Sequence, residues 1–112
     1  MKTKVLSLLV VAMLGVVTVF AGNQTEQIEV KGNGNEMSKD RIEKAALSVE
    51  GVSSAAWDME TKMLEVVFDE TATDTDKIEV AIAEAGHDTP NYKASDEVYN
   101  ALPEGCKYRE QE

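Results

Sequence analysis

The sequence has 112 residues, of which 43% are hydrophobic and 29% charged, and 21 acidic against 11 basic side chains give a formal net charge of −10. This length predicts one small domain. The negative charge argues against nucleic acid as a partner, because proteins bind nucleic acid through basic side chains that neutralise phosphates. A single histidine and a single cysteine leave few groups for nucleophilic catalysis and no pair for an internal disulfide. We therefore expect neither an enzyme nor a disulfide-stabilised fold.

The first 21 residues have the pattern of a secretory signal peptide. Lys2 and Lys4 give a positive start, residues 5–20 are an apolar run, and Ala21 supplies a small residue at the cleavage position. The run is shorter than the ~20 residues that a helix needs to cross a bilayer, so a retained anchor is the less favoured alternative. We expect residues 1–21 to be removed, no membrane insertion afterwards, and a periplasmic or secreted protein.

The next part of the chain predicts a strand and a helix. Residues 22–26 are interpreted as a short polar linker, and residues 27–31 then alternate apolar and polar side chains as a half-buried strand does. Apolar side chains recur at intervals of three and four over residues 42–49, which indicates a helix. Ser38 is predicted to cap this helix and Gly51 to end it.

A hairpin and a second helix are predicted after that glycine. Residues 52–59 and 63–68 are rich in β-forming side chains, and a short polar turn separates them. Asp74 or Thr75 then caps a helix that ends at Gly86.

The rest of the chain predicts two short elements. An extended stretch runs to Asn91 and supplies a fourth strand. Ser95 or Asp96 then begins a last helix over residues 97–102. Its apolar contacts are expected to be Val98 and Leu102.

The predicted element order is βαββαβ, and its two halves resemble each other. Each half has a helix that contains Ile-Glu, at residues 42–43 and 78–79, and that closes on a glycine. Two split βαβ units predict an α+β, ferredoxin-like sandwich: a four-stranded antiparallel sheet with both helices on one face, followed by the short C-terminal helix. The side chains expected in its core are Ile28, Val30, Ile42, Ala46, Trp57, Leu64, Val66, Phe68, Ile78 and Ile82.

One run of the sequence resembles the heavy-metal-associated domain family. It starts at Gly32 and reads Gly-Asn-Gly-Asn-Glu-Met-Ser-Lys-Asp-Arg-Ile-Glu-Lys-Ala-Ala-Leu, and Gly-Val at 51–52 and Gly-His at 86–87 follow it. The resemblance covers residues 27–91, while residues 92–112 are similar to a helical extension of secreted members from Bacteroidetes-type bacteria. The family contains copper chaperones, mercury-binding periplasmic proteins and metal-binding domains of metal-transporting ATPases. The resemblance thus implies heavy-metal binding or transport, with Cu(I) or another soft ion as cargo and a metal transporter or related metal-binding protein as partner.

The family binds its metal through two cysteines three positions apart, where the first loop meets the first helix. Soft ions such as monovalent copper prefer thiolates, and the helix dipole lowers the pKa of thiols at a helix N-terminus. In this sequence Asn35 and Ser38 occupy those two positions, and neither can supply a thiolate. The C-terminal extension also reads Gly105-Cys106 where related tails end in paired cysteines. The resemblance therefore implies a metal site that is degenerate or lost.

Three side chains remain as candidate ligands of a soft metal: Met37, His87 and Cys106. They offer a thioether inside the first loop, an imidazole beside that loop and a thiol in the C-terminal extension. Each also has a simpler interpretation. Met37 can be an ordinary loop side chain, His87 a ring that packs over the loop, and Cys106 a free thiol or half of an intermolecular disulfide.

Two functions stay open at the level of sequence. The first is a metal-handling protein with a weakened soft-metal site, in which replacing Cys106 by serine lowers copper affinity. The second is a non-metal protein–protein interaction module on the same fold, whose acidic surface docks on a partner in a salt-sensitive complex.

Overall fold

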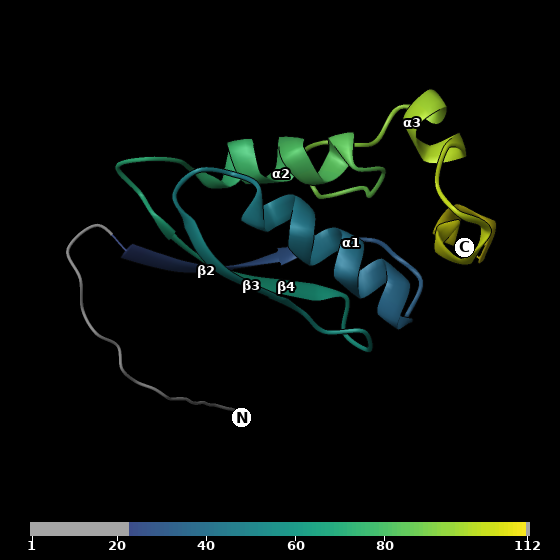
Figure 1. Cartoon of the computed structure of the whole chain (residues 1–112), viewed down its shortest axis with the longest axis horizontal. Helices are drawn as coiled ribbons and strands as arrows, with labels where there is room; N and C mark the ends of the chain where they lie inside the picture. The colour runs from purple at the N-terminus through teal and green to yellow at the C-terminus, as the bar shows by residue number, and fades with distance from the viewer. Residues whose placement is uncertain (1–22, 112) are drawn as a thin grey trace.

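Residues 23–111 are described by the computed structural model of the chain, and the predicted signal peptide lies outside them. Helices α1 and α2 lie on one face of a sheet, and the last helical turns lie at one end of the molecule (Figure 1). In chain order the elements are β2 (Asn23–Glu29), α1 (Glu36–Leu47), β3 (Val52–Trp57), β4 (Met63–Asp69), α2 (Thr75–Glu84), α3 (Asp96–Asn100) and the 3₁₀ turns η2 (Glu104–Cys106) and η3 (Tyr108–Gln111).

The sheet has three strands in the order β2-β4-β3, and both pairings are antiparallel. The predicted hairpin is confirmed as β3 and β4. Its turn is held by Asp58, whose Oδ1 accepts hydrogen bonds from the backbone N–H groups of Glu60 and Thr61. The first strand begins at Asn23, earlier than predicted, and Glu26 pairs with Val66 of β4. Residues 23–26 are therefore part of the sheet, because the ladder to β4 holds them although their side chains do not alternate in polarity.

The predicted fourth strand does not form in the described part of the chain. Only one backbone hydrogen bond joins this segment to the end of the first strand, from the N–H of Lys31 to the carbonyl of Asp88. The next N–H groups bond elsewhere: Thr89 donates to the carbonyl of Tyr92, and Asn91 donates to a carboxylate oxygen of Glu79. Pro90 has no N–H to donate. The expected four-stranded sheet is thus a three-stranded one.

Helix α1 is capped by Asn35 and not, as predicted, by Ser38. The side-chain Oδ1 of Asn35 accepts the N–H of Ser38 at 2.8 Å, and Ser38 lies within the helix, fully buried. Both residue types are good caps, so the sequence alone did not separate them. Helix α2 follows the prediction, because Asp74 caps it and Gly86 lies after its end with a φ of 110°.

The core contains the predicted side chains. Every one of them is buried in a single cluster between the sheet and the two long helices. The indole N–H of Trp57 donates to the carbonyl of Val30 at 3.1 Å, so the one polar atom of this ring is satisfied inside the core. The periodicity of the sequence therefore placed the body of the domain correctly.

Residues 92–111, called the tail below, form a second small cluster. Ser95 caps α3, which confirms the first of the two predicted starts, Ser95 or Asp96. Leu102 is buried as expected. Val98 is only partly buried, and Tyr99 takes the inward position instead. Leu102 packs on the end of α2, where a Cβ added to Gly86 would lie 2.7 Å from its Cδ2. The other members of this cluster are Cys106 and Tyr108.

Candidate metal-binding site

The tail docks on the first loop through a single carbonyl group. The side-chain amides of Asn33 and Asn35 both donate to the carbonyl oxygen of Gly105, at 2.7 and 2.8 Å. Two donors on one acceptor fix the position of η2 over the start of α1. Sequence patterns could not find this contact, because it joins residues about seventy positions apart.

Asn35 connects the start of α1 to the tail. Its Oδ1 accepts from the backbone of Ser38 while its Nδ2 donates to Gly105, so one carboxamide joins the two segments. Asn35 and Ser38 occupy the two positions at which the family has cysteines. Cys106 follows Gly105 directly and is fully buried. The tail therefore places the one thiol of the described chain next to the loop where the family's thiolates would be.

The thioether of Met37 adjoins the same turn. A Cβ built on Gly105 would lie 3.8 Å from Cε and 4.0 Å from Sδ of Met37. Met37 is the second residue of α1 rather than a loop residue, and it is 49% exposed. Its sulfur is thus available at the rim of the turn that contains Cys106.

The imidazole of His87 is fully buried and has a defined tautomer. Its Nδ1 lies 2.8 Å from the carbonyl oxygen of Lys31. Because a carbonyl can only accept, the hydrogen of the neutral ring is on Nδ1 and the lone pair is on Nε2. This Nε2 is buried without a hydrogen-bond partner in the described structure. A histidine that donates the N–H of one ring nitrogen to the backbone, and keeps the lone pair of the other nitrogen free, has the arrangement typical of metal-ligating histidines.

The surroundings of His87 keep its ring neutral. Burial lowers its pKa below the ordinary value of 6.5, and the nearby charge of Arg41 lowers it further, against the opposing effects of the Lys31 carbonyl and Asp88. The ring stacks on Tyr108 with centroids 5.4 Å apart. Gly32 lies beside the ring, and a Cβ there would approach Ile42 Cδ1 to 3.1 Å and Trp57 Cη2 to 3.3 Å but would make only an ordinary contact with His87 Nδ1, at 3.4 Å. His87 therefore does pack over the loop, as its simpler interpretation predicted.

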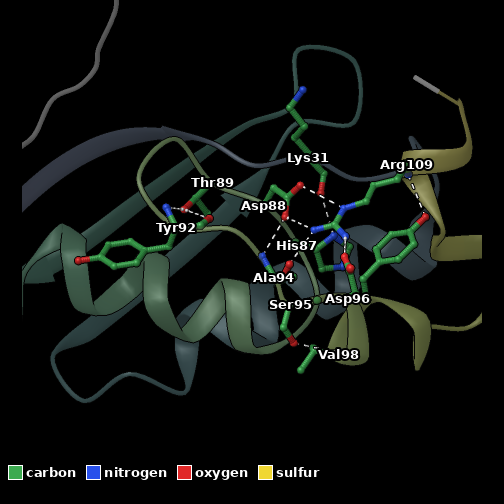
Figure 2. A network of polar contacts seen from close by, with 12 residues as sticks. Lys31, His87, Asp88, Thr89, Tyr92, Ala94, Ser95, Asp96, Val98 and Arg109 are labelled. Atoms are coloured by element: carbon green, nitrogen blue, oxygen red, sulfur yellow. Dashed lines mark hydrogen bonds and ion pairs between the residues drawn. The ribbon is translucent and has the colours of Figure 1, made fainter.

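An ion pair between Asp88 and Arg109 holds the tail beside His87 (Figure 2). Arg109 Nη2 donates to Asp88 Oδ1 at 2.8 Å, its Nε donates to Oδ2 at 3.3 Å, and Nη2 also reaches the carbonyl of Ala94 at 2.8 Å. Burial alone would raise the pKa of Asp88, but the hydrogen bonds from Arg109 and from the N–H of Ala94 outweigh it and hold this pKa below the usual range. The pair is mostly shielded from water, so it is a stronger contact than a surface salt bridge.

One tyrosine hydroxyl completes the attachment of the tail, and a second one acts within the tail. Tyr108 donates to the carbonyl of Gly86 at 2.8 Å and accepts from the N–H of Asp88 at 2.9 Å. Burial raises the pKa of Tyr108, so its hydroxyl keeps its proton at physiological pH. Tyr99 accepts the N–H of Arg109 at 2.9 Å, and its ring lies under that guanidinium.

The structure brings the three predicted ligands to one end of the domain but does not test them as a set. Met37 lies beside Gly105, the residue before Cys106, and His87 stacks on Tyr108 of the tail. Between residues 23 and 111, no group of three or more His, Cys, Asp or Glu side chains gathers where it could hold a metal ion, and no helix is long and apolar enough to span a membrane. The side chains missed at the sequence level are Asn33, Asp88, Tyr108 and Arg109. The only signal for the last two was a tail that contains several tyrosines and one arginine.

Comparison with known proteins identifies the class of protein that this fold defines. The Heavy-metal-associated domain profile matches residues 27–88, more than half of the chain. The chain therefore belongs to the heavy-metal-associated domain family, a family of non-enzymatic domains. Most of the tail lies beyond the matched residues. A search of curated proteins gives no match.

Solved structures share this fold. The chain is similar to the CopZ metallochaperone, with 26% identity, a TM-score of 0.57, and coverage of 59% of this chain and 98% of that one. It is also similar to oxidised MerP from Ralstonia metallidurans CH34, with 33% identity, a TM-score of 0.57, and coverage of 60% and 93%. The copper binding domain from HMA7, a P-type ATPase, is 26% identical over 58% of this chain and 88% of its own, with a TM-score of 0.56.

Proposed function

We propose that this protein handles a soft metal ion of the copper type in the periplasm or outside the cell, through a site that has moved from the family's cysteine pair to Cys106, His87 and Met37. The observation that supports this proposal most is the buried, unpartnered Nε2 of His87, whose other ring nitrogen is hydrogen-bonded to the carbonyl of Lys31. The signal-peptide pattern of the first 21 residues supports the location.

The donor types fit a soft monovalent ion better than a hard one. A thiolate, a thioether and a neutral imidazole are soft or intermediate ligands, whereas magnesium and calcium require several oxygen ligands. Asn35 and Ser38 add no charge and no sulfur, so we expect the affinity to lie below that of a two-thiolate site. The partner to which the ion passes is proposed to be a metal transporter or a related metal-binding protein, in keeping with the relatives.

The second candidate function is an interaction module without metal. The observation that favours it is the closure of the first loop by Gly105, because both asparagine amides of the loop are occupied by the tail. In that case the acidic surface would dock on a basic partner, and salt would weaken the complex.

A competition titration separates the two candidates. The reduced protein is titrated with Cu(I) against a chelator of known affinity, alongside Cys106→Ser, His87→Phe and Met37→Leu. Binding of one ion per chain that weakens by about tenfold or more in Cys106→Ser and in His87→Phe supports the relocated site. Met37→Leu is expected to have the smallest effect, because its thioether lies at the exposed rim.

A matched control is Leu47→Met, which adds a thioether at an exposed site on α1 away from the tail and should leave copper binding unchanged. Micromolar or weaker binding that no substitution alters would overturn the metal function. The interaction module would then be the function to pursue, by searching for partners whose binding falls as salt rises.

A further inference from the structure

Strand β2 has a hydrogen-bonding partner on one side only within residues 23–111. It pairs with β4, and no other described strand lies against it. Two bonds just past its end give the direction of its backbone groups: the N–H of Val30 donates to Lys62 on the β4 side, and the N–H of Lys31 donates to Asp88 on the opposite side. Successive residues of an antiparallel strand alternate in this way.

The alternation identifies the backbone groups at the open edge. Thr25, Gln27 and Glu29 lie an even number of positions before Lys31. They therefore direct both their N–H and C=O groups away from β4, as Lys31 does. All three residues are exposed, and within the described chain no backbone group bonds to these outward-facing groups. Three consecutive outward-facing residues offer up to six hydrogen bonds, which is the length of edge that a short added strand uses.

The predicted fourth strand, which ends at Asn91, could have covered this edge, but it makes most of its hydrogen bonds elsewhere. His87 uses a side-chain nitrogen, not a backbone group, to reach Lys31, and the N–H groups of Thr89 and Asn91 bond within their own loop and to α2. Where the segment leaves the sheet, a hollow of about 170 Å³ remains beside Pro90, and its lining includes the carboxylates of Glu29 and Asp88 as well as Lys31 and Lys93. A side chain of an added strand has room there.

The charge of the edge favours a basic occupant. Glu26 and Glu29 are exposed on β2 itself. Gln27 and Gln24 donate to two further carboxylates, those of Glu65 at 3.5 Å and Glu70 at 2.8 Å. Carboxylates along an edge discourage pairing with a second copy of the same acidic chain, while they attract a strand that has lysine or arginine.

From these observations we infer that the free edge of β2 is a docking site for an extended, basic segment of another protein, which adds to the sheet as its fourth strand. Backbone hydrogen bonds to Thr25, Gln27 and Glu29 supply the affinity, and the surrounding carboxylates supply the selectivity. This inference does not depend on metal binding, because it uses backbone groups of β2 and none of the proposed metal ligands.

The test uses the purified ¹⁵N-labelled protein and the peptide Thr-Lys-Val-Lys-Val-Lys-Thr as probe, with Thr-Glu-Val-Glu-Val-Glu-Thr as the charge-reversed control. We expect the lysine peptide to shift the amide resonances of residues 25, 27 and 29 and to slow their hydrogen exchange by about tenfold or more. The glutamate peptide should leave them unchanged.

A substitution at the edge provides the structural control. Gln27→Pro removes one outward N–H without touching the ladder to β4, so the fold and the melting temperature should hold while peptide binding weakens by about tenfold. Gln27→Thr keeps the N–H and should bind as the wild type does. The inference is overturned if the lysine peptide shifts other regions instead, if neither peptide binds at about 1 mM, if both bind equally, or if Gln27→Pro folds and still binds normally.

Discussion

The body of the domain, residues 23–86, and the tail, residues 92–111, are stabilised by different kinds of contact. The body is held by one apolar cluster between the sheet and two helices, and its polar groups are mostly in regular ladders and caps. The tail has a small cluster of its own, but it is fixed to the rest of the domain by an ion pair, two asparagine amides and the hydroxyl of Tyr108. Apolar burial therefore makes the fold, while directional polar contacts decide where Cys106 lies.

The largest effect is expected from the core of the body. Leu64 is fully buried at the centre of the sheet, and Leu64→Ala should cost about 2–5 kcal/mol of unfolding free energy through lost burial and a residual cavity. Urea denaturation followed by circular dichroism measures this loss. A loss of unfolding free energy below about 1 kcal/mol would contradict the claim that apolar burial is what stabilises the body of the domain.

The ion pair of the tail comes next. Arg109→Ala removes the partner of a largely buried carboxylate, and we expect a cost of about 1–3 kcal/mol. The distinguishing readout is local: iodoacetamide should alkylate Cys106 about tenfold faster or more, while the amide exchange of the sheet is unchanged.

Arg109→Lys is the matched control for this prediction. It keeps the charge but cannot reach both oxygens of Asp88, so its alkylation rate should lie between those of the wild type and Arg109→Ala. Equal alkylation rates in all three proteins would show that Arg109 does not hold the tail.

The pH dependence of stability separates two groups beside the tail. The pKa of His87 is lower in the folded protein than its ordinary 6.5, so below about pH 6.5 the unfolded chain binds a proton that the folded chain does not. Stability should therefore begin to fall as pH drops through 6.5. The pKa of Asp88 is also lowered, from 3.8, so its contribution should be lost only at pH below about 4.

His87→Phe tests the assignment, because it should remove the decline that begins near pH 6.5 and leave the acid-side decline in place. Melting temperatures measured from pH 8 to pH 3 give both curves. An unchanged decline in His87→Phe would assign it to other groups.

The smallest effect concerns the cap of α1. Asn35→Ala removes both the cap and one bond to Gly105 and should cost about 1 kcal/mol. Asn35→Asp keeps an oxygen for the cap but loses the donor to Gly105, so it should raise the alkylation rate of Cys106 with little change in unfolding free energy. If both variants are equally destabilised, the cap is not what Asn35 contributes.

The sequence predicted the body well because hydrophobic periodicity reports which face of each element is buried. Ile28, Leu64 and Ile82 were all placed in the core by their spacing alone, and the structure confirms them. The prediction of a fourth strand was wrong, because it did not consider the hydrogen bonds of the segment. A short extended segment becomes a strand only if its backbone groups are free to pair, and those of Thr89 and Asn91 are not.

The candidate site was only partly predictable. Residue chemistry singled out Cys106, His87 and Met37 as soft donors, and their role as a ligand set stays a prediction. The position of Cys106 rests on contacts of Asn35 and Arg109, which act across distances in the chain that no local pattern reports. The missing cysteine pair was visible in the sequence, but the docking of the tail over its position was not.

The most direct test of the relocated site is copper K-edge X-ray absorption on the reduced protein loaded with one equivalent of Cu(I). The account predicts sulfur and nitrogen neighbours together, with one sulfur lost in Cys106→Ser and the nitrogen lost in His87→Phe. A spectrum without sulfur, or one that neither substitution changes, would contradict it.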